Sequence, residues 1–218
     1  MGQPGYDALA ELYAETFPSP YLRPIERHAI HAFADMVNDM DGDGLVIDVG
    51  CGPGDVTADL AQLGLDVLGV DPSPEMLAIA RRKYPNQRFA LDDAHLSALA
   101  TTLRVDAILA RFSLIHVPPN EIPGILSTWH ERLRPEGVVA VACQMADETV
   151  PDVAEFDHRV ARAWRWNPDH LTELLTEAGF TELWRTIGRP DADHRFPEVH
   201  LVFQRESEDD FTDPKGTP

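Results

Sequence analysis

The sequence predicts an α/β fold built on a seven-stranded, mostly parallel sheet with helices on both faces. Short apolar runs alternate along the chain with stretches whose apolar residues recur at helical spacing. The run at 138–143 is almost wholly apolar, as expected of a strand buried on both faces of a parallel sheet. The 218 residues suit one ordinary domain, which we expect over 1–205.

The elements of this sheet follow one another in order. The expected strands are 45–49, 66–70, 88–91, 105–110, 138–143, 180–189 and 198–205. The expected intervening helices end before Gly64, begin at Ser73, cover 94–101, carry Ile122 to Leu133, and run from Asn167 to Gly179. Ser73 and Asn167 are good N-caps because each precedes a proline that fits the first helical position. Gly64 and Gly179 suit helix C-termini.

Three segments lie outside this rhythm. Helices expected at 6–16 and 24–40 are too short for an independent domain, so 1–40 is predicted to be a helical cap. Residues 144–166 have weak periodicity and are predicted to be an insertion after the fifth strand. There, His158, Trp164 and Trp166 line a substrate pocket or, as is commoner for aromatic pairs, pack in the core. The acidic stretch 206–218 is predicted to be a disordered tail.

Charge limits the partners. Thirty-seven acidic and 18 basic residues give a net charge of −19, which repels nucleic acids and anionic membranes. No apolar run is long enough to span a membrane, and the N-terminus resembles no secretory signal, so we expect a cytoplasmic monomer or homodimer. The two cysteines have neither disulfide-scaffold density nor zinc-ligand spacing, so reduced thiols are expected.

A glycine-rich loop, Gly50-Cys51-Gly52-Pro53-Gly54, joins the first strand to its helix. Such a loop offers backbone N–H groups to a ligand that approaches closely. Asp55 stands where the dinucleotide motif G-x-G-x-x-G has its third glycine, and Pro53 removes one donor. An NAD-dependent oxidoreductase is therefore disfavoured, and the acid at the helix start suits a cationic or neutral ligand.

The stretch 46–54 closely resembles the first motif of class I S-adenosylmethionine-dependent methyltransferases. The resemblance continues to residue 143 through four landmarks: Asp71, Asp93-Ala94, the turn 111–116, and Leu133–Gly137. It implies a Rossmann-like sheet, S-adenosylmethionine as cofactor and S-adenosylhomocysteine as product.

The resemblance also implies a set of cofactor-binding residues. From the sheet edge these are Asp48, Gly50, Cys51, Gly52, Gly54, Asp71, Pro72, Met76, Asp93, Ala94 and Arg111. Asp71 is expected to bind the ribose hydroxyls, and Asp92 competes with Asp93 for the adenine amine. Arg111 either orients an acidic substrate or the cofactor carboxylate, or forms a structural ion pair. Tyr13 or Arg23 of the cap is expected at the methionine end, since the family closes its cofactor with N-terminal helices.

His116 is the candidate general base. It follows the fourth strand at the carboxyl edge of the sheet, and a histidine pKa near 6.5 suits proton transfer. The alternative is a structural role under the helix start at Pro118-Pro119. Arg111 and Gln144 stand where a metal-assisted site would place acids, so no metal is expected.

The predicted function is in-line methyl transfer from S-adenosylmethionine to an oxygen or nitrogen atom of a small-molecule acceptor. A non-catalytic S-adenosylmethionine-binding regulatory protein on the same fold is the alternative.

Overall fold

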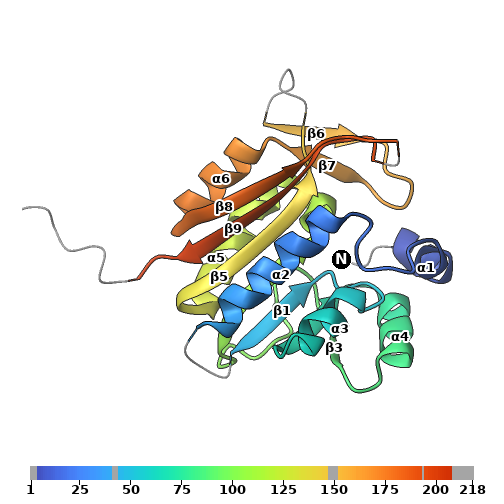
Figure 1. Ribbon diagram of the computed structural model, residues 1–218, viewed down its shortest axis with the longest axis horizontal. Helices are drawn as coiled ribbons and strands as arrows, with labels where there is room; N and C mark the ends of the chain where they lie inside the picture. The colour runs from blue at the N-terminus through green and yellow to red at the C-terminus, as the bar shows by residue number, and fades with distance from the viewer. Residues whose placement is uncertain (1–3, 41–43, 147–151, 193, 208–218) are drawn as a thin grey trace, which may run out of the picture.

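The computed structural model describes residues 4–40, 44–146, 152–192 and 194–207, and its main feature is a seven-stranded sheet in the order β3-β2-β1-β4-β5-β9-β8 (Figure 1). The strands are β1 (Leu45–Val49), β2 (Asp66–Asp71), β3 (Arg88–Leu91), β4 (Val105–Arg111), β5 (Leu133–Gln144), β8 (Phe180–Gly188) and β9 (Glu198–Arg205). β9 pairs antiparallel with β5 and β8, and the remaining pairs are parallel. The predicted fold class is confirmed.

Helices cover both faces of this sheet. They are α1 (Pro4–Thr16), α2 (Pro24–Asn38), α3 (Asp55–Gln62), α4 (Pro74–Lys83), α5 (Ile122–Arg132) and α6 (Pro168–Glu177). α2 crosses the near face in Figure 1, and α5 and α6 lie behind the sheet. α1 packs against α4 at one end of the molecule. The predicted caps form, because the Ser73 hydroxyl accepts from Met76 N at 3.1 Å and the Asn167 side chain accepts from Asp169 N at 2.9 Å.

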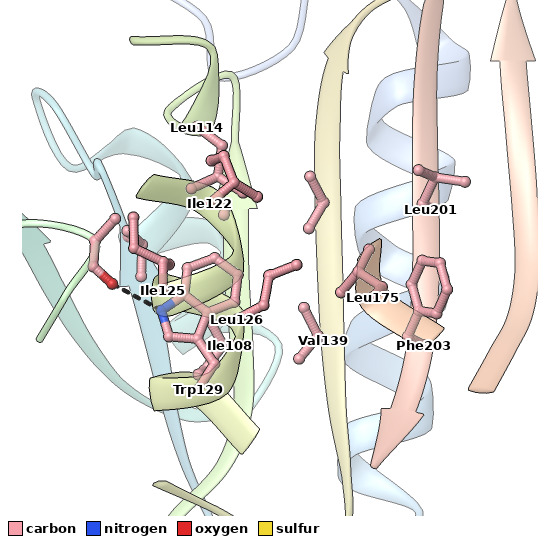
Figure 2. Packing of buried hydrophobic residues seen from close by; sticks show 14 of the residues in the cluster. Ile108, Leu114, Ile122, Ile125, Leu126, Trp129, Val139, Leu175, Leu201 and Phe203 are labelled. Carbon is pink, nitrogen blue, oxygen red and sulfur yellow. Dashed lines mark hydrogen bonds between the residues drawn. The ribbon is translucent and has the colours of Figure 1, made fainter. Parts of the chain in front are cut away.

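The largest apolar cluster lies between the sheet and the helices α5 and α6 (Figure 2). Trp129 of α5 is fully buried there, and its Nε1 donates a hydrogen bond to the carbonyl of Ala94 at 2.8 Å. On the opposite face, Ile30 and Phe33 of α2 pack against β1, β2, β4 and β5. Two such layers are what a parallel sheet needs to bury both of its faces.

The helix predicted at 94–101 is wrong. This segment is a series of turns, and Leu96 has a left-handed φ of 53°. Its carbonyls are satisfied by side chains of α5 instead of by helical bonds, because Arg132 donates to the carbonyls of Leu96, Leu99 and Ala100. Three donors from one distant guanidinium replace the local ladder, which the sequence pattern of the segment could not reveal.

The segment predicted as an insertion contains a small antiparallel hairpin, β6 (Val153–Phe156) and β7 (Ala163–Trp166). Trp166 belongs to the main core cluster and Trp164 is also buried, so the core interpretation holds for both. A bridge between Met145 and Trp166 ties the hairpin to the end of β5. Residues 147–151 of the predicted insertion and 208–218 of the predicted tail lie outside the described residues.

Candidate active site

The glycine loop turns sharply between β1 and α3. Gly50, Gly52 and Gly54 have φ values of 73°, 52° and 83°, a region that L side chains rarely adopt. A Cβ on Gly50 would overlap Ser113 of the loop after β4. A Cβ on Gly52 would meet no atom within 4 Å. Gly50 is therefore required by packing, whereas Gly52 faces open space that a ligand can enter.

Asp71 ends β2 beside this loop. Its Oδ2 accepts from the backbone N–H of Gly52 and its Oδ1 from that of Ser73, both at 2.8 Å. Burial raises the pKa of Asp71 to about 6, and the nearby Asp7 carboxylate adds to the rise, while the two N–H donors oppose it. Two donors leave lone pairs on both oxygens, so the carboxylate can accept further hydrogen bonds.

Asp48 lies within β1, two residues before Gly50 of the glycine loop. It is 2% exposed, and its Oδ2 accepts a 2.6 Å hydrogen bond from the hydroxyl of Thr57 in α3. Burial raises the pKa of Asp48 to about 6, and the Thr57 hydroxyl and Arg111 oppose the rise. Burial also raises the pKa of the Cys51 thiol, which keeps it protonated and makes it a packing residue of the loop.

The turn after β3 holds the two acids that compete for the adenine position. Both oxygens of Asp92 accept backbone N–H groups, from Asp93 and Ala98. Asp93 is less buried, and its Oδ1 accepts from His95 N at 2.9 Å. Asp92 thus shapes the turn, whereas Asp93 is the more accessible of the two, and the choice between them for the adenine amine stays a prediction.

The loop after β4 begins with a backbone outlier. Phe112 has a φ of 52°, unusual for a bulky residue, and its N–H donates to the carbonyl of Ala142 at 2.8 Å. The resulting turn brings Ser113 against Gly50 and leaves the buried Ser113 hydroxyl without a hydrogen-bond partner among the described residues. Left-handed backbone at a bulky residue is often found at functional sites.

His116 follows in a short 3₁₀ turn, Leu114–His116. Its Nδ1 lies 3.0 Å from the carbonyl of Arg162 and its Nε2 lies 2.8 Å from the Tyr6 hydroxyl. Since a carbonyl can only accept, Nδ1 must carry the proton, and Nε2 accepts from Tyr6. The ring therefore joins the β4 loop to α1 and to the β6–β7 hairpin.

Burial lowers the pKa of His116 to about 4, with His158 adding to the effect and the Arg162 carbonyl opposing it. The expectation of an ordinary histidine pKa near 6.5 is wrong for this reason. His116 is a neutral imidazole at pH 7, with its basic nitrogen already hydrogen-bonded to Tyr6. Both hydrogen bonds of the ring run to Tyr6 and Arg162, and neither runs to the helix start at Pro118.

α1 covers the edge of the sheet beside Asp71. Tyr6, Tyr13 and Ala10 of α1 form a small apolar cluster with the buried Met76 and Ile79 of α4. The Ser73 hydroxyl donates to Asp7 of α1 at 2.6 Å. Tyr13 therefore packs with Met76 between α1 and α4, and its contact with the methionine end of the cofactor stays a prediction.

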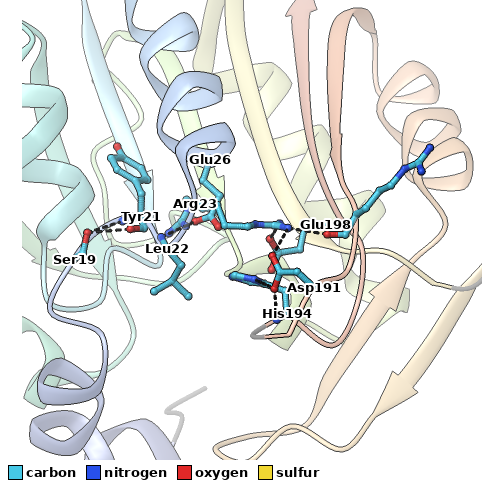
Figure 3. Close-up of polar contacts among 10 residues, drawn as sticks. Ser19, Tyr21, Leu22, Arg23, Glu26, Asp191, His194 and Glu198 are labelled. Atoms are coloured by element: carbon cyan, nitrogen blue, oxygen red, sulfur yellow. Dashed lines mark hydrogen bonds and ion pairs between the residues drawn. The ribbon is translucent and has the colours of Figure 1, made fainter.

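Arg23 and Arg111 lie in a partly buried ion-pair network, and Figure 3 shows the contacts of Arg23 with Glu26 and Glu198. Glu26, 1% exposed, pairs with both arginines, and Arg23 also pairs with Glu198 of β9. Arg23 further donates to the carbonyl of Arg189 at 3.0 Å. The structural ion pair weighed for Arg111 is present, and Arg23 is directed toward β9.

A family model matches the segment that contains the glycine loop. Residues 46–137 match the model described as "Methyltransferase domain", and this segment contains Asp48, the glycine loop, Asp71 and His116. The segment 46–137 is by this match a methyltransferase domain, as the resemblance to class I S-adenosylmethionine-dependent methyltransferases implies.

Relatives of this methyltransferase domain include trans-aconitate 2-methyltransferases. The protein of that name from Methylobacterium radiotolerans is 42% identical over 122 residues, which cover 55% of this chain and 43% of that protein. An uncharacterized methyltransferase from Oceanobacillus iheyensis is 32% identical over 43% of this chain and 44% of its own length. The chain thus matches less than half the length of both relatives.

Solved methyltransferase structures share the fold. The 1,6-didemethyltoxoflavin N1-methyltransferase of Burkholderia thailandensis, with S-adenosylhomocysteine bound, has a TM-score of 0.62 at 22% identity, over 87% of this chain and 93% of that chain. A Clostridium acetobutylicum methyltransferase has a TM-score of 0.69 at 14% identity, over 93% and 99%. At these identities the likeness concerns the fold alone.

The residues of this methyltransferase domain fit S-adenosylmethionine. The space in front of Gly52 can admit the ligand, and Asp71 at its side can accept hydroxyl hydrogen bonds. Two buried acids, Asp48 and Asp71, suit a ligand with cationic sulfonium and ammonium groups. Among the described residues, no three His, Cys, Asp or Glu side chains gather as a possible metal site.

Sequence reasoning missed several partners of the methyltransferase site. Tyr6 with His116 and Asp7 with Ser73 join residues 110 and 66 positions apart, and no sequence signal pairs them. The Thr57 contact with Asp48 could have been predicted, because a hydroxyl in the first turn after the glycine loop can reach back to the strand.

Among the described helices, none is long and apolar enough to cross a membrane.

Proposed function

We propose that the protein transfers a methyl group from S-adenosylmethionine to an oxygen or nitrogen atom of a small-molecule acceptor. The observation that carries this proposal is the glycine loop, which opens at Gly52 beside a buried carboxylate, Asp71, within the matched methyltransferase segment. The bound cofactor supplies a methyl group already activated by its sulfonium. The protein's own task is therefore to bind, to align and to exclude water.

The cofactor residues divide this task. Asp71 accepts the ribose hydroxyls, and Asp93 with the backbone at Ala94 meets the adenine. Gly50, Cys51, Gly52 and Gly54 provide the close backbone approach, and Pro72 and Met76 line the adjoining wall. Tyr13 closes the site from α1. The negative charge of Asp48 attracts the cationic groups of the cofactor. Arg111, which pairs with Glu26, partly offsets that charge.

The acceptor is proposed to bind where α1, the loop after β4 and the β6–β7 hairpin meet. Tyr6, His116 and His158 gather there, with the rings of His116 and His158 4.8 Å apart. For a hydroxyl acceptor, we propose His116 as the base, reached directly or through one water once its Nε2 exchanges Tyr6 for the acceptor. Relatives named for trans-aconitate support a small organic acid as the first acceptor to test. An ionised carboxylate would need no base.

The test is methyl transfer from labelled S-adenosylmethionine to trans-aconitate and to a panel of small hydroxyl and amine compounds. Expected is labelled product together with S-adenosylhomocysteine. The Gly52→Val variant should give neither. Cofactor binding by calorimetry without turnover on any compound would instead support the non-catalytic regulatory alternative, and absence of S-adenosylhomocysteine binding would refute both.

A further inference from the structure

We propose that Asp7 of α1 is a positioning residue of the cofactor site, acting on the ribose-binding carboxylate of Asp71 through Ser73. The inference rests on the proposed cofactor site. It assigns to the helical cap a specific role in cofactor affinity, beyond covering the site.

The link is a continuous series of hydrogen bonds. Ser73 donates its hydroxyl proton to Asp7 at 2.6 Å, and its backbone N–H donates to Asp71 at 2.8 Å. The same hydroxyl accepts from Met76 N at 3.1 Å and so caps the N-terminus of α4. A hydroxyl has a single proton, so donation to Asp7 turns its lone pairs toward Met76. Asp7 thereby fixes the orientation of Ser73, 1% exposed, and of the N–H that holds Asp71.

The electrostatic surroundings of Asp71 lead to the same residue. Three titratable residues of α1 interact electrostatically with Asp71, namely Asp7, Tyr6 and Tyr13. On β1 and the glycine loop, Asp48 and Cys51 do the same. Backbone N–H groups of Gly52 and Ser73 lower the pKa of Asp71, whereas burial and then Asp7 raise it. Asp7 thus orders the carboxylate and also opposes its ionised form, which is the better acceptor for ribose hydroxyls.

A matched control lies on the same helix. Glu11 of α1 pairs with Arg82 of α4 at 2.8 Å, and both side chains are largely exposed. This pair joins the same two helices but has no bond to Ser73 or Asp71. Glu11→Gln therefore tests the general docking of α1, and Asp7 variants test the specific link.

The experiment measures S-adenosylhomocysteine binding by calorimetry on the full chain between pH 5 and pH 8. At pH 8, Asp7→Ala should weaken binding by about three- to tenfold, because the hydrogen bond that orders Ser73 is lost. Asp7→Asn should stay within about twofold of wild type, since its amide oxygen still accepts from Ser73. Both variants remove a negative charge, so the pH at which affinity falls by half should move below the wild-type value. Glu11→Gln should change neither quantity.

Three outcomes would overturn the inference. These are wild-type affinity and pH dependence in Asp7→Ala, equal losses in Asp7→Asn and Asp7→Ala at pH 8, or an equal loss in Glu11→Gln. A melting curve of each variant identifies any that fails to fold, and the pH midpoint of Asp7→Asn then remains decisive. If wild type itself binds no S-adenosylhomocysteine, the proposed function fails first, and that result is distinct from the three above.

Discussion

The two sides of the site are built from contacts of different range. On the cofactor side, Asp48 bonds to Thr57 nine positions away, and Asp71 bonds to Ser73 and Gly52 at separations of two and 19. On the acceptor side, His116 bonds to Tyr6 and Arg162 at separations of 110 and 46. Apart from the contacts that Asp7 and Tyr13 make from α1, the first side is specified by one continuous segment, which also carries the family match. The second is assembled by the cap and the insertion, which lie outside that match.

The comparison predicts that substitutions on the two sides fail in different assays. Changes on the cofactor side should alter affinity for S-adenosylhomocysteine, and changes on the acceptor side should alter turnover.

The largest effect is expected for Gly52→Val. A side chain there would fill the open space in front of the loop, so binding of S-adenosylhomocysteine by calorimetry should be abolished. Gly64→Val is the matched control, because Gly64 also has a positive φ and its Cβ would meet only Asn38 at 3.9 Å. Equal binding losses in both variants would mean that backbone strain, and not a blocked site, explains the result.

His116→Asn tests the acceptor side. For a hydroxyl acceptor, turnover should fall by about 10²- to 10⁴-fold, with cofactor affinity nearly unchanged. For a carboxylate acceptor the change should be small, because that nucleophile is already ionised. A base works when deprotonated, so wild-type turnover should be insensitive to this group from pH 6 to 8 and fall only toward pH 4. If wild-type turnover instead falls as the pH drops through 6.5, and this fall is absent in His116→Asn, the lowered pKa of His116 is contradicted.

Asp71→Ala should weaken S-adenosylhomocysteine binding by about 1.5 to 3 kcal/mol, the range for hydrogen bonds to a charged group. It should also lower stability, because the N–H groups of Gly52 and Ser73 lose their acceptor. Calorimetry and urea unfolding separate the two effects. Unchanged affinity in a folded variant would remove Asp71 from the ribose site.

Deletion of residues 1–20 tests whether the cap is a lid. Loss of Tyr13 and of the Asp7–Ser73 bond should raise the dissociation constant of S-adenosylhomocysteine by roughly tenfold, while the remaining sheet still melts cooperatively. Equal affinity in the truncated protein would show that α1 only packs on α4.

The same difference in range explains what the sequence could predict. Strands 45–49 and 88–91 were predicted with the observed bounds, because apolar runs and turn residues determine them locally. The helix expected at 94–101 failed because Trp129 and Arg132, more than 30 positions away, satisfy the carbonyls of that segment. The pKa of His116 depends on burial by the cap and hairpin, which no local pattern encodes.

The smallest expected effect concerns pH and isolates the charge of Asp71. In the folded protein the pKa values of Asp48 and Asp71 are raised to about 6 from an ordinary value of 3.8. Between these values the folded state binds more protons than the unfolded state, so the free energy of unfolding falls as pH rises through 6. Lowering the pH from 7 to 5.5 should therefore add about 1 kcal/mol of stability for each of these two carboxyl groups, while His116, whose pKa burial lowers to about 4, opposes this gain because the unfolded state takes up a proton over the same interval.

Asp71→Asn removes one of the two groups, so its change in unfolding free energy between pH 7 and pH 5.5, measured by urea unfolding, should favour the folded state by about 1 kcal/mol less than the change in wild type. Binding should respond with the opposite sign. The ionised carboxylate is the better acceptor, so wild-type affinity for S-adenosylhomocysteine should fall over the same interval in which protonation of Asp71 stabilises the fold. If wild-type affinity instead rises toward pH 5.5, Asp71 does not bind the ribose in its ionised form, and the cofactor side loses its main charged contact.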